Sequence, residues 1–186
     1  LNSAQWNELY YESLVNAGFA ADAAEAEQLY PSGWDGVTDT DWRDVVSNKN
    51  ANTESYDISI TGGNEKTTYY TSLGYMSQDG VNLGTNYERI SGKVSFSQQF
   101  TDKLKVSNSL TPSFVTQNGQ LEGSAYFSNP VAAYLFTWPI DKPRNDDGTP
   151  NLDLGTSTYN PLYVYNNDIN LRQQTRVFDA LDLSYE

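Results

Sequence analysis

Three short segments in the first half of the chain place an apolar side chain at every second position, and this alternation constrains the fold more than any other feature. The apolar positions are Tyr56, Ile58, Ile60, Leu73, Ile90, Val94 and Phe96. Because successive side chains of a strand point to opposite faces, each segment is predicted to be a strand with one apolar and one wet face. Such a sheet covers a protein core, or it forms the wall of a transmembrane barrel with lipid outside and water inside.

The connections between the predicted strands alternate in length. The strands are expected at residues 53–61, 67–76, 87–99, 104–116 and 171–186. Short turns follow the first and third strands, whereas long segments follow the second and fourth. Outer-membrane barrels show this alternation, with short periplasmic turns and long outer loops. The predicted fold class is therefore mainly β: an antiparallel meander that is part of a large transmembrane β-barrel, with short helices in long outer loops.

Four regions follow from this reading. Residues 1–52 form a helical and loop segment on the outer side, with helices expected at residues 2–18 and 20–30 and a loop over 31–52. Residues 53–116 form four barrel strands. Residues 117–170 form a long outer loop, with a short helix from Asn129–Pro130 to Phe136. Residues 171–186 form a further, incomplete strand, so the chain is expected to be part of a longer protein.

Three residues interrupt the apolar faces of the last two predicted strands. Asn108 and Pro112 share a face with leucines and valines in the fourth strand, and Asp179 does so in the fifth. Proline cannot donate to a strand ladder, and an ionised carboxylate is costly at mid-membrane depth. Bulges, or strand portions that rise above the lipid, are expected at these positions.

Composition excludes several classes of function. The chain has no cysteine and no histidine, which removes disulfides, cysteine nucleophiles and serine–histidine–aspartate catalysis. Its 24 acidic residues outnumber its 11 basic ones, so a nucleic acid is not an expected partner. The aspartates between Asp35 and Asp44 lack the regular spacing of a calcium loop. We do not expect the chain to be an enzyme, and no cofactor or metal site is predicted.

Aromatic side chains in the predicted outer loops are the candidate substrate-binding residues, because an aromatic face can stack on a sugar ring. They are Trp34, Trp42, Tyr126, Phe127 and Trp138. The alternative is that these rings pack the loops against one another or against a lid protein. On the wet face, Arg89 and Lys93 tune selectivity or pair with nearby carboxylates.

Several stretches, spread over most of residues 38–186, carry a family likeness. Thr40-Asp41-Trp42, and the run from Tyr56 through Gly62-Gly63-Asn64-Glu-Lys-Thr-Thr-Tyr-Tyr70, resemble the SusC/RagA family of TonB-dependent outer-membrane transporters. The resemblance implies a large barrel in the cell outer membrane, in contact with lipid and plugged by an N-terminal domain. It implies a SusD-like surface lipoprotein as lid, energy supplied by TonB through the plug, and an oligosaccharide or peptide as cargo. Neither the plug nor the TonB-contacting segment is found in these residues, and no catalytic residue is implied.

A soluble, secreted β-sheet carbohydrate-binding module is the alternative hypothesis, with the same loop aromatics bound to sugar. The two hypotheses differ in where the apolar face of the sheet points. In a barrel, Ile58, Leu73 and Val94 face outward and contact only lipid, whereas in a module they form a buried core.

Overall fold

The computed structural model describes residues 1–119 and 129–185. These residues form two compact units. The helical unit comes from residues 1–47 and from the part of 120–168 that is described, and the sheet unit comes from residues 48–119 and 169–185.

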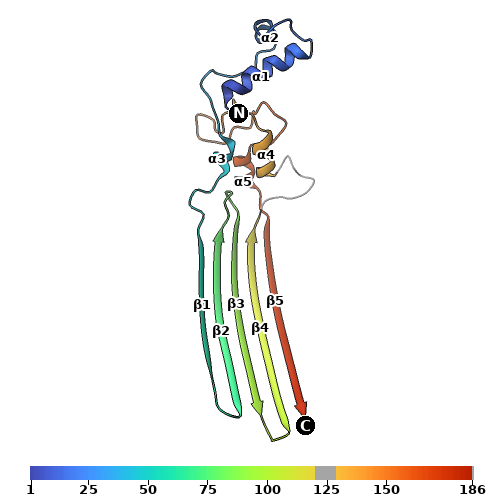
Figure 1. Ribbon diagram of the computed structural model, residues 1–186. Coiled ribbons are helices and arrows are strands. Elements are labelled where there is room, and N and C mark those ends of the chain that lie inside the picture. The colour runs from blue at the N-terminus through green and yellow to red at the C-terminus, as the bar shows by residue number, and fades with distance from the viewer. Residues whose placement is uncertain (120–128, 186) are drawn as a thin grey trace. The chain divides into compact units, whose positions relative to one another are not determined.

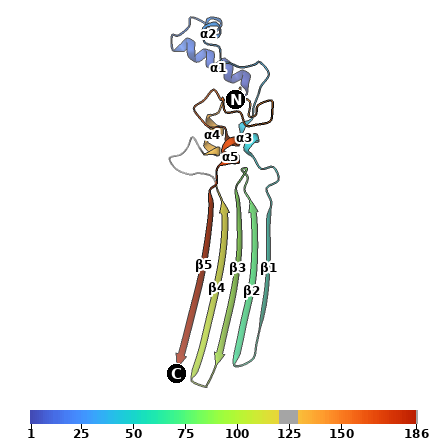
Figure 2. The same ribbon diagram turned by 180° about the vertical axis from the view of Figure 1, so that it is seen from behind.

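The sheet unit is an antiparallel meander of five strands that lie side by side in chain order (Figure 1, Figure 2). The strands are β1 (Thr53–Gly63), β2 (Thr67–Asp79), β3 (Asn86–Gln99), β4 (Leu104–Asn118) and β5 (Leu171–Tyr185). Each predicted strand is present, and the first four are one to three residues longer than expected. The meander and its mainly β class are therefore confirmed.

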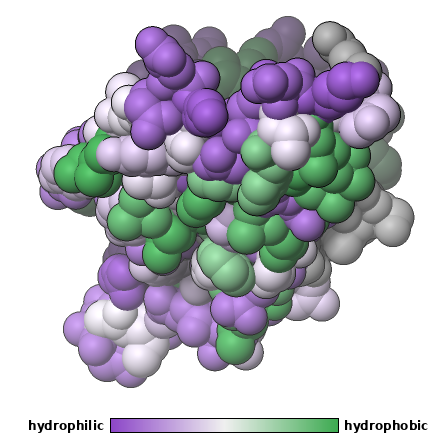
Figure 3. Space-filling model, turned by 90° about the horizontal axis from the view of Figure 1, so that it is seen from below, coloured by the Kyte–Doolittle hydropathy of each residue, from purple (hydrophilic) through white to green (hydrophobic). Residues whose placement is uncertain are grey.

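Strand pairing aligns the apolar positions on one face of the sheet. Tyr56 lies opposite Tyr75, which in turn lies opposite Ile90, and Ile90 lies opposite Phe114. We call this the apolar face; its large apolar side chains are Tyr56, Ile58, Ile60, Tyr69, Leu73, Tyr75, Ile90, Val94, Phe96, Leu104, Val106, Leu110, Phe114, Leu171, Val177, Leu181, Leu183 and Tyr185. The other, polar face is dominated by serine, threonine and charged residues. Figure 3, seen from below, shows hydrophobic side chains gathered in a band with hydrophilic ones along one side of it.

The apolar face is exposed. Ile58 is 66% exposed, Leu73 58% and Val94 52%. A sheet that covers a protein core buries such side chains almost completely. The described part of the chain therefore does not use this face as the core of a globular module.

Pro112 is accommodated without a bulge, so the bulge expected there is wrong. The β3–β4 register is the same on both sides of it, with Ser91 opposite Ser113 and Val94 opposite Leu110. A Cβ atom built on Gly92 of the neighbouring strand would lie 3.5 Å from Cγ of Pro112, an ordinary van der Waals distance. The proline ring therefore packs over β3 without a clash.

Asn108 and Asp179 form a polar pair on the apolar face. The β4–β5 register is continuous from Leu104 to Asn118, so no bulge displaces either residue. The amide of Asn108 donates to Oδ1 of Asp179 at 2.7 Å and to the carbonyl oxygen of Ala180 at 3.3 Å. The carboxylate thus has a neutral donor beside it, which reduces the cost of placing it among apolar side chains.

The two helices predicted near the N-terminus are present in the helical unit. α1 spans Ser3–Asn16 and begins with a capping box, in which Asn2 accepts from the backbone of Gln5 and the side chain of Gln5 accepts from the backbone of Asn2. α2 spans Ala23–Leu29 and is capped by Asp22. Both caps satisfy backbone donors that a helix start leaves without partners.

Three further helices complete this unit, and two of them were not predicted. α4 (Pro130–Phe136) begins after Asn129, as expected. α3 (Trp42–Val46) lies in the segment predicted to be loop, and α5 (Pro161–Asn167) lies in the second half of the long loop. α5 starts at Asn160–Pro161, the same asparagine–proline signal that predicted α4. In the described part of the chain, no helix is long and apolar enough to cross a membrane.

Candidate functional site

The segment from Asp39 to Trp42 holds the helical unit together. Trp42 is 4% exposed, and its indole N–H donates to the carbonyl oxygen of Trp138 at 2.8 Å. The backbone N–H of Thr40 donates to the carbonyl of Pro139 at 2.8 Å, and its hydroxyl donates to the carbonyl of Asp141 at 2.8 Å. These bonds attach the first segment of the unit to the second, about a hundred residues later in the chain.

The carboxylates of this acidic stretch serve as backbone acceptors. Asp39 accepts from the N–H of Ser3 at 2.8 Å, at the start of α1. Asp41 caps α3 by accepting from the N–H of Asp44 at 3.1 Å. Asp35 accepts from the N–H groups of Val37 and Thr38 and from the Thr38 hydroxyl, and these bonds hold the pKa of its carboxyl well below the usual range. The stretch thus has a structural role.

A groove of about 600 Å³ opens beside this segment, within the helical unit. Its aromatic and aliphatic lining comes from three helices: Trp6 on α1, Trp42 on α3, and Tyr134 and Leu135 on α4, with Trp138 just after α4. Its charged lining is Asp39, Asp41 and Arg43. Aromatic rings beside carboxylates and a guanidinium are the groups with which proteins bind sugars and other polar organic ligands.

The Trp138 ring, which lines this groove, is in close contact with Trp6 and with Gly155. One face lies against Trp6, with ring centroids 4.7 Å apart and planes 39° from parallel. The ring also lies directly against Gly155, where any side chain would collide with it. Trp6 in turn stacks on Tyr10 at 5.3 Å. A ligand bound in the groove would therefore meet a packed aromatic cluster, with Tyr134 and Leu135 also in the lining.

The predicted binding residues fall in three places. Trp42 and Trp138 line the groove, although Trp42 is nearly buried. Trp34 lies outside it and donates its indole N–H to the carbonyl of Thr38 at 2.7 Å. Tyr126 and Phe127 lie outside the described residues. Their binding of a ligand stays a prediction.

The prediction missed Trp6, Tyr134 and Leu135 as lining residues of the groove. In the sequence, Trp6 belongs to the apolar stripe of a helix, which indicates packing and not binding. The side chain of Leu135, 67% exposed beside the groove, had no periodic signal at all.

The carboxyl of Asp141, in the helical unit, lies in surroundings that disfavour its charged form. Burial raises its pKa above the ordinary value, although the N–H groups of Gly155 and Trp138 oppose the shift. Its Oδ1 accepts from Gly155 at 3.1 Å, whereas Oδ2 is buried without a hydrogen-bond partner in the described part of the chain. The charged form of this side chain therefore weakens the fold.

Asp141→Asn is expected to stabilise the helical unit at neutral pH by up to about 1 kcal/mol, because it removes a half-buried charge and keeps the acceptor for Gly155. A folded-state pKa above the unfolded value means that the wild-type unit loses stability as the pH rises through that folded pKa. The variant should lack this loss. Hydrogen exchange of residues 129–168 at pH 4 and pH 7 measures both effects, and an equal pH dependence in the two proteins would contradict the assignment.

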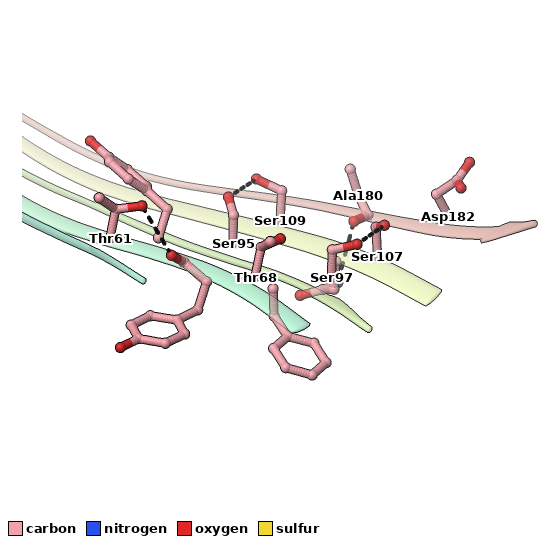
Figure 4. Close-up of a pocket in the computed structure, with 12 residues that line it drawn as sticks. Thr61, Thr68, Ser95, Ser97, Ser107, Ser109, Ala180 and Asp182 are labelled. Carbon is pink, nitrogen blue, oxygen red and sulfur yellow. Dashed lines mark hydrogen bonds between the residues drawn. The ribbon is translucent and has the colours of Figure 1, made fainter. Parts of the chain in front are cut away.

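The polar face of the sheet carries a ladder of small hydroxyl groups. Figure 4 shows Ser95 and Ser109 joined by a hydrogen bond of 3.0 Å, and the Ser107 hydroxyl donating to Ser97 at 3.0 Å. Thr61 and Thr68 lie near them, in a shallow hollow of about 440 Å³. Hydroxyl groups both donate and accept, so this surface can hydrogen-bond water, a sugar or another protein.

Arg89 and Lys93 lie on the polar face, as predicted. The Lys93 ammonium sits 5.9 Å from the centre of the Tyr70 ring. Neither residue forms an ion pair within residues 1–119 and 129–185, so the alternative of pairing with a carboxylate is not seen there.

Known proteins resemble this chain over most of its length. No protein-family model matches it. TonB-dependent receptor P26 of Formosa agariphila is 31% identical over 140 residues, which cover 75% of this chain and 13% of that receptor. TonB-dependent receptor P3 of the same organism is 27% identical over 163 residues, or 83% of this chain and 16% of the receptor.

Two solved structures share the fold. The RagAB peptide importer in the "closed-closed" state matches 82% of this chain with a TM-score of 0.56 and 21% identity. A structure of the RagAB peptide transporter matches 81% with the same TM-score. The chain spans about a sixth or less of the curated receptors, and about a fifth of the RagAB chains.

By sequence, the chain is a segment of a TonB-dependent outer-membrane receptor, and its fold is shared with the RagAB chains.

Proposed function

We propose that this chain forms part of the barrel wall and outer loops of a transporter that imports an oligosaccharide, or a peptide, across the outer membrane. The observation that carries the proposal is the exposed apolar face, which lies opposite a hydroxyl-rich face across five strands. In a barrel wall the apolar face contacts lipid and the polar face lines the lumen.

The height of the apolar face supports the lipid contact. On β4 this face runs from Leu104 to Phe114, a span of ten residue steps. At ~3.3 Å per residue this is ~33 Å along the strand, and a strand tilt of ~40° reduces it to ~25 Å across the membrane. That is the thickness of the apolar band of outer-membrane barrels.

The connections support the orientation. β1 begins, β2 meets β3, and β4 meets β5 at one end of the sheet, which we call the outer end. Residues 1–52, 80–85 and 119–170 all attach there, whereas the two connections at the opposite end are short: 64–66 and 100–103. Long loops mark the extracellular side of outer-membrane barrels.

The groove of the helical unit is the proposed first contact for cargo. It belongs to the long outer segments, and it combines aromatic rings with two carboxylates and Arg43. We also propose a SusD-like lipoprotein as the lid over these segments, with TonB acting on a plug region to release the cargo. The similarity to RagAB supports a two-protein arrangement of this kind.

Asp179→Leu is expected to make the barrel more stable, by about 1 kcal/mol, if the apolar face contacts lipid. Asp179 lies near the middle of that face, where a carboxylate is unfavourable even with Asn108 beside it. The measurement is the midpoint of unfolding of the full-length receptor in urea, with Asp182→Leu on the polar face as the control. Loss of the folded receptor in the Asp179→Leu variant would show that this position contacts protein.

The proposed function is tested by uptake of fluorescently labelled oligosaccharides and peptides in cells that carry the full-length receptor. Trp6→Ala opens the groove and should lower uptake several-fold. The matched control is Phe19→Ala, which truncates an aromatic ring that is 60% exposed and lies outside the groove. A receptor that is soluble without detergent, or uptake that is independent of TonB, would contradict the proposal.

A further inference from the structure

Four basic side chains form a zigzag on the polar face of the sheet. They alternate between β5 and β3 on successive rows of this face: Arg172, Arg89, Arg176 and Lys93. The strand register sets this order. Along β4, Gln117 pairs with Arg172 of β5, and Val115, on the next row, pairs with Arg89 of β3. Ser113, on the row after that, lies between Arg176 of β5 and Ser91 of β3. Lys93 follows two residues after Ser91. The zigzag therefore flanks β4 on both sides.

Positive charge on this face is local. The strands present five basic residues and two acidic ones on the polar face: Arg89, Lys93, Lys105, Arg172, Arg176, Asp57 and Asp182. The whole chain, in contrast, has a net charge of −13. None of the four zigzag residues forms an ion pair with another described residue. A surface of unpaired cations in an acidic protein is suited to an anionic occupant.

The zigzag lies in the outer half of the sheet. Arg172 is the second residue of β5 and Arg89 the fourth of β3, and both strands begin at the outer end. The other half carries the small hydroxyls of Ser95, Ser97 and Ser107, which leave a flat surface suited to close protein packing. Cargo that enters from the outside meets the basic half first.

The spacing and the floor of the zigzag favour an extended sugar chain. Neighbouring rows of one strand face are ~7 Å apart, so a chain along β4 would meet a cation at about every row, on alternate sides. Between the cations, β4 presents the hydroxyls of Thr111 and Ser113, which can hydrogen-bond sugar hydroxyls. An extended peptide needs a free strand edge for its backbone bonds, whereas β4 is paired on both sides.

We infer that this wall binds an anionic oligosaccharide, one that carries carboxylate or sulfate groups; the inference rests on the proposed transport function. The guanidinium groups of Arg89, Arg172 and Arg176 each match two oxygens of a carboxylate or sulfate. Residues 1–47 and 120–168 are strongly acidic, and they repel an anion at long range. Since salt screens charges beyond ~8 Å, we expect the wall to select by affinity at contact and not by attraction from solution.

The test is equilibrium binding to the purified full-length receptor, with sulfated maltohexaose, neutral maltohexaose and hexaglutamate as probes. The sulfated sugar should bind about tenfold more tightly than the neutral one, and the preference should decline as salt is added. Arg89→Gln with Arg176→Gln should remove most of this preference and leave the neutral sugar unaffected. The matched control, Lys66→Gln with Lys103→Gln, removes the same charge from the short turns and should change nothing.

Three outcomes would overturn the inference. Equal binding of the sulfated and neutral sugars would show no anion selection, and tighter binding of hexaglutamate would identify an acidic peptide as the ligand. A double variant that unfolds at lower temperature but keeps its preference would indicate that the cations pair with an acidic protein surface inside the receptor. Uptake of the same probes by cells that carry the full-length receptor separates this inference from the proposed transport function. Import of the neutral sugar alone contradicts only the inference of anion binding. A receptor that imports none of the probes contradicts the transport function.

Discussion

Ile58→Arg is expected to prevent most of the full-length receptor from assembling in the outer membrane. Ile58 lies at the centre of the apolar face on β1, 66% exposed. If this face contacts lipid, an arginine near mid-depth costs about 2–4 kcal/mol. This is a large part of the stability of a folded domain, which is about 5–15 kcal/mol. The measurement is the fraction of receptor in the outer-membrane fraction that migrates as a compact, heat-sensitive band on a gel.

Ser59→Arg is the matched control for this prediction. Ser59 is the next residue on β1 and pairs with Ser72 on the polar face, so its side chain points to the opposite side of the sheet. The lumen of a barrel is wet, and an added charge there costs little. Assembly should remain near the wild-type level. Equal damage by the two substitutions would contradict the assignment of the faces, and damage by Ser59→Arg alone would reverse it.

Trp42→Ala is expected to unfold much of the helical unit. Removal of a buried tryptophan ring costs about 3–5 kcal/mol, and this ring also supplies the hydrogen bond to the carbonyl of Trp138. Because the residues around it join the two segments of the unit, loss of the ring should expose both segments together. Hydrogen exchange of residues 1–47 and 129–168 in the full-length receptor should increase by several orders of magnitude, while the strands keep their protection.

Trp42→Phe separates the packing of the ring from its hydrogen bond, and Leu135→Ala is the control. Trp42→Phe keeps most of the packing and loses the N–H donor, so it should cost about 1–2 kcal/mol. Leu135→Ala removes a side chain that is 67% exposed and should change stability by less than about 0.5 kcal/mol. If Trp42→Ala left the exchange of both segments unchanged, the unit would not depend on this ring, and a binding role for Trp42 would become the better explanation.

The candidate site was predictable only in part. Large aromatics in long polar segments indicate a place of contact, and Trp42 and Trp138 do meet there. Their spacing in the sequence could not show that the Trp42 ring is buried or that the Trp138 ring lies directly against Gly155. Trp6 reaches the same groove from α1, a contact that depends on how distant segments pack.

The short helices, too, could be predicted from the sequence only in part. α4 and α5 share an asparagine–proline start, and attention to that signal would have found both. α3 is only five residues long, too short to be stable by its own propensity. It is held by the Asp41 cap and by the burial of Trp42 and Val46, and burial is decided by the rest of the unit.

The amino-acid sequence alone determined the strands, their order and the two faces of the sheet, because a period of two residues and the turns between strands are local properties. Tertiary structure alone decided which interruptions of the apolar face are tolerated. Pro112 keeps the β3–β4 register without a bulge, and Asp179 is paired because Asn108 lies on the next strand. Tertiary structure also brought the basic residues of β3 and β5 to the two sides of β4. Such contacts join residues far apart in the chain, and only the register of the assembled sheet specifies them.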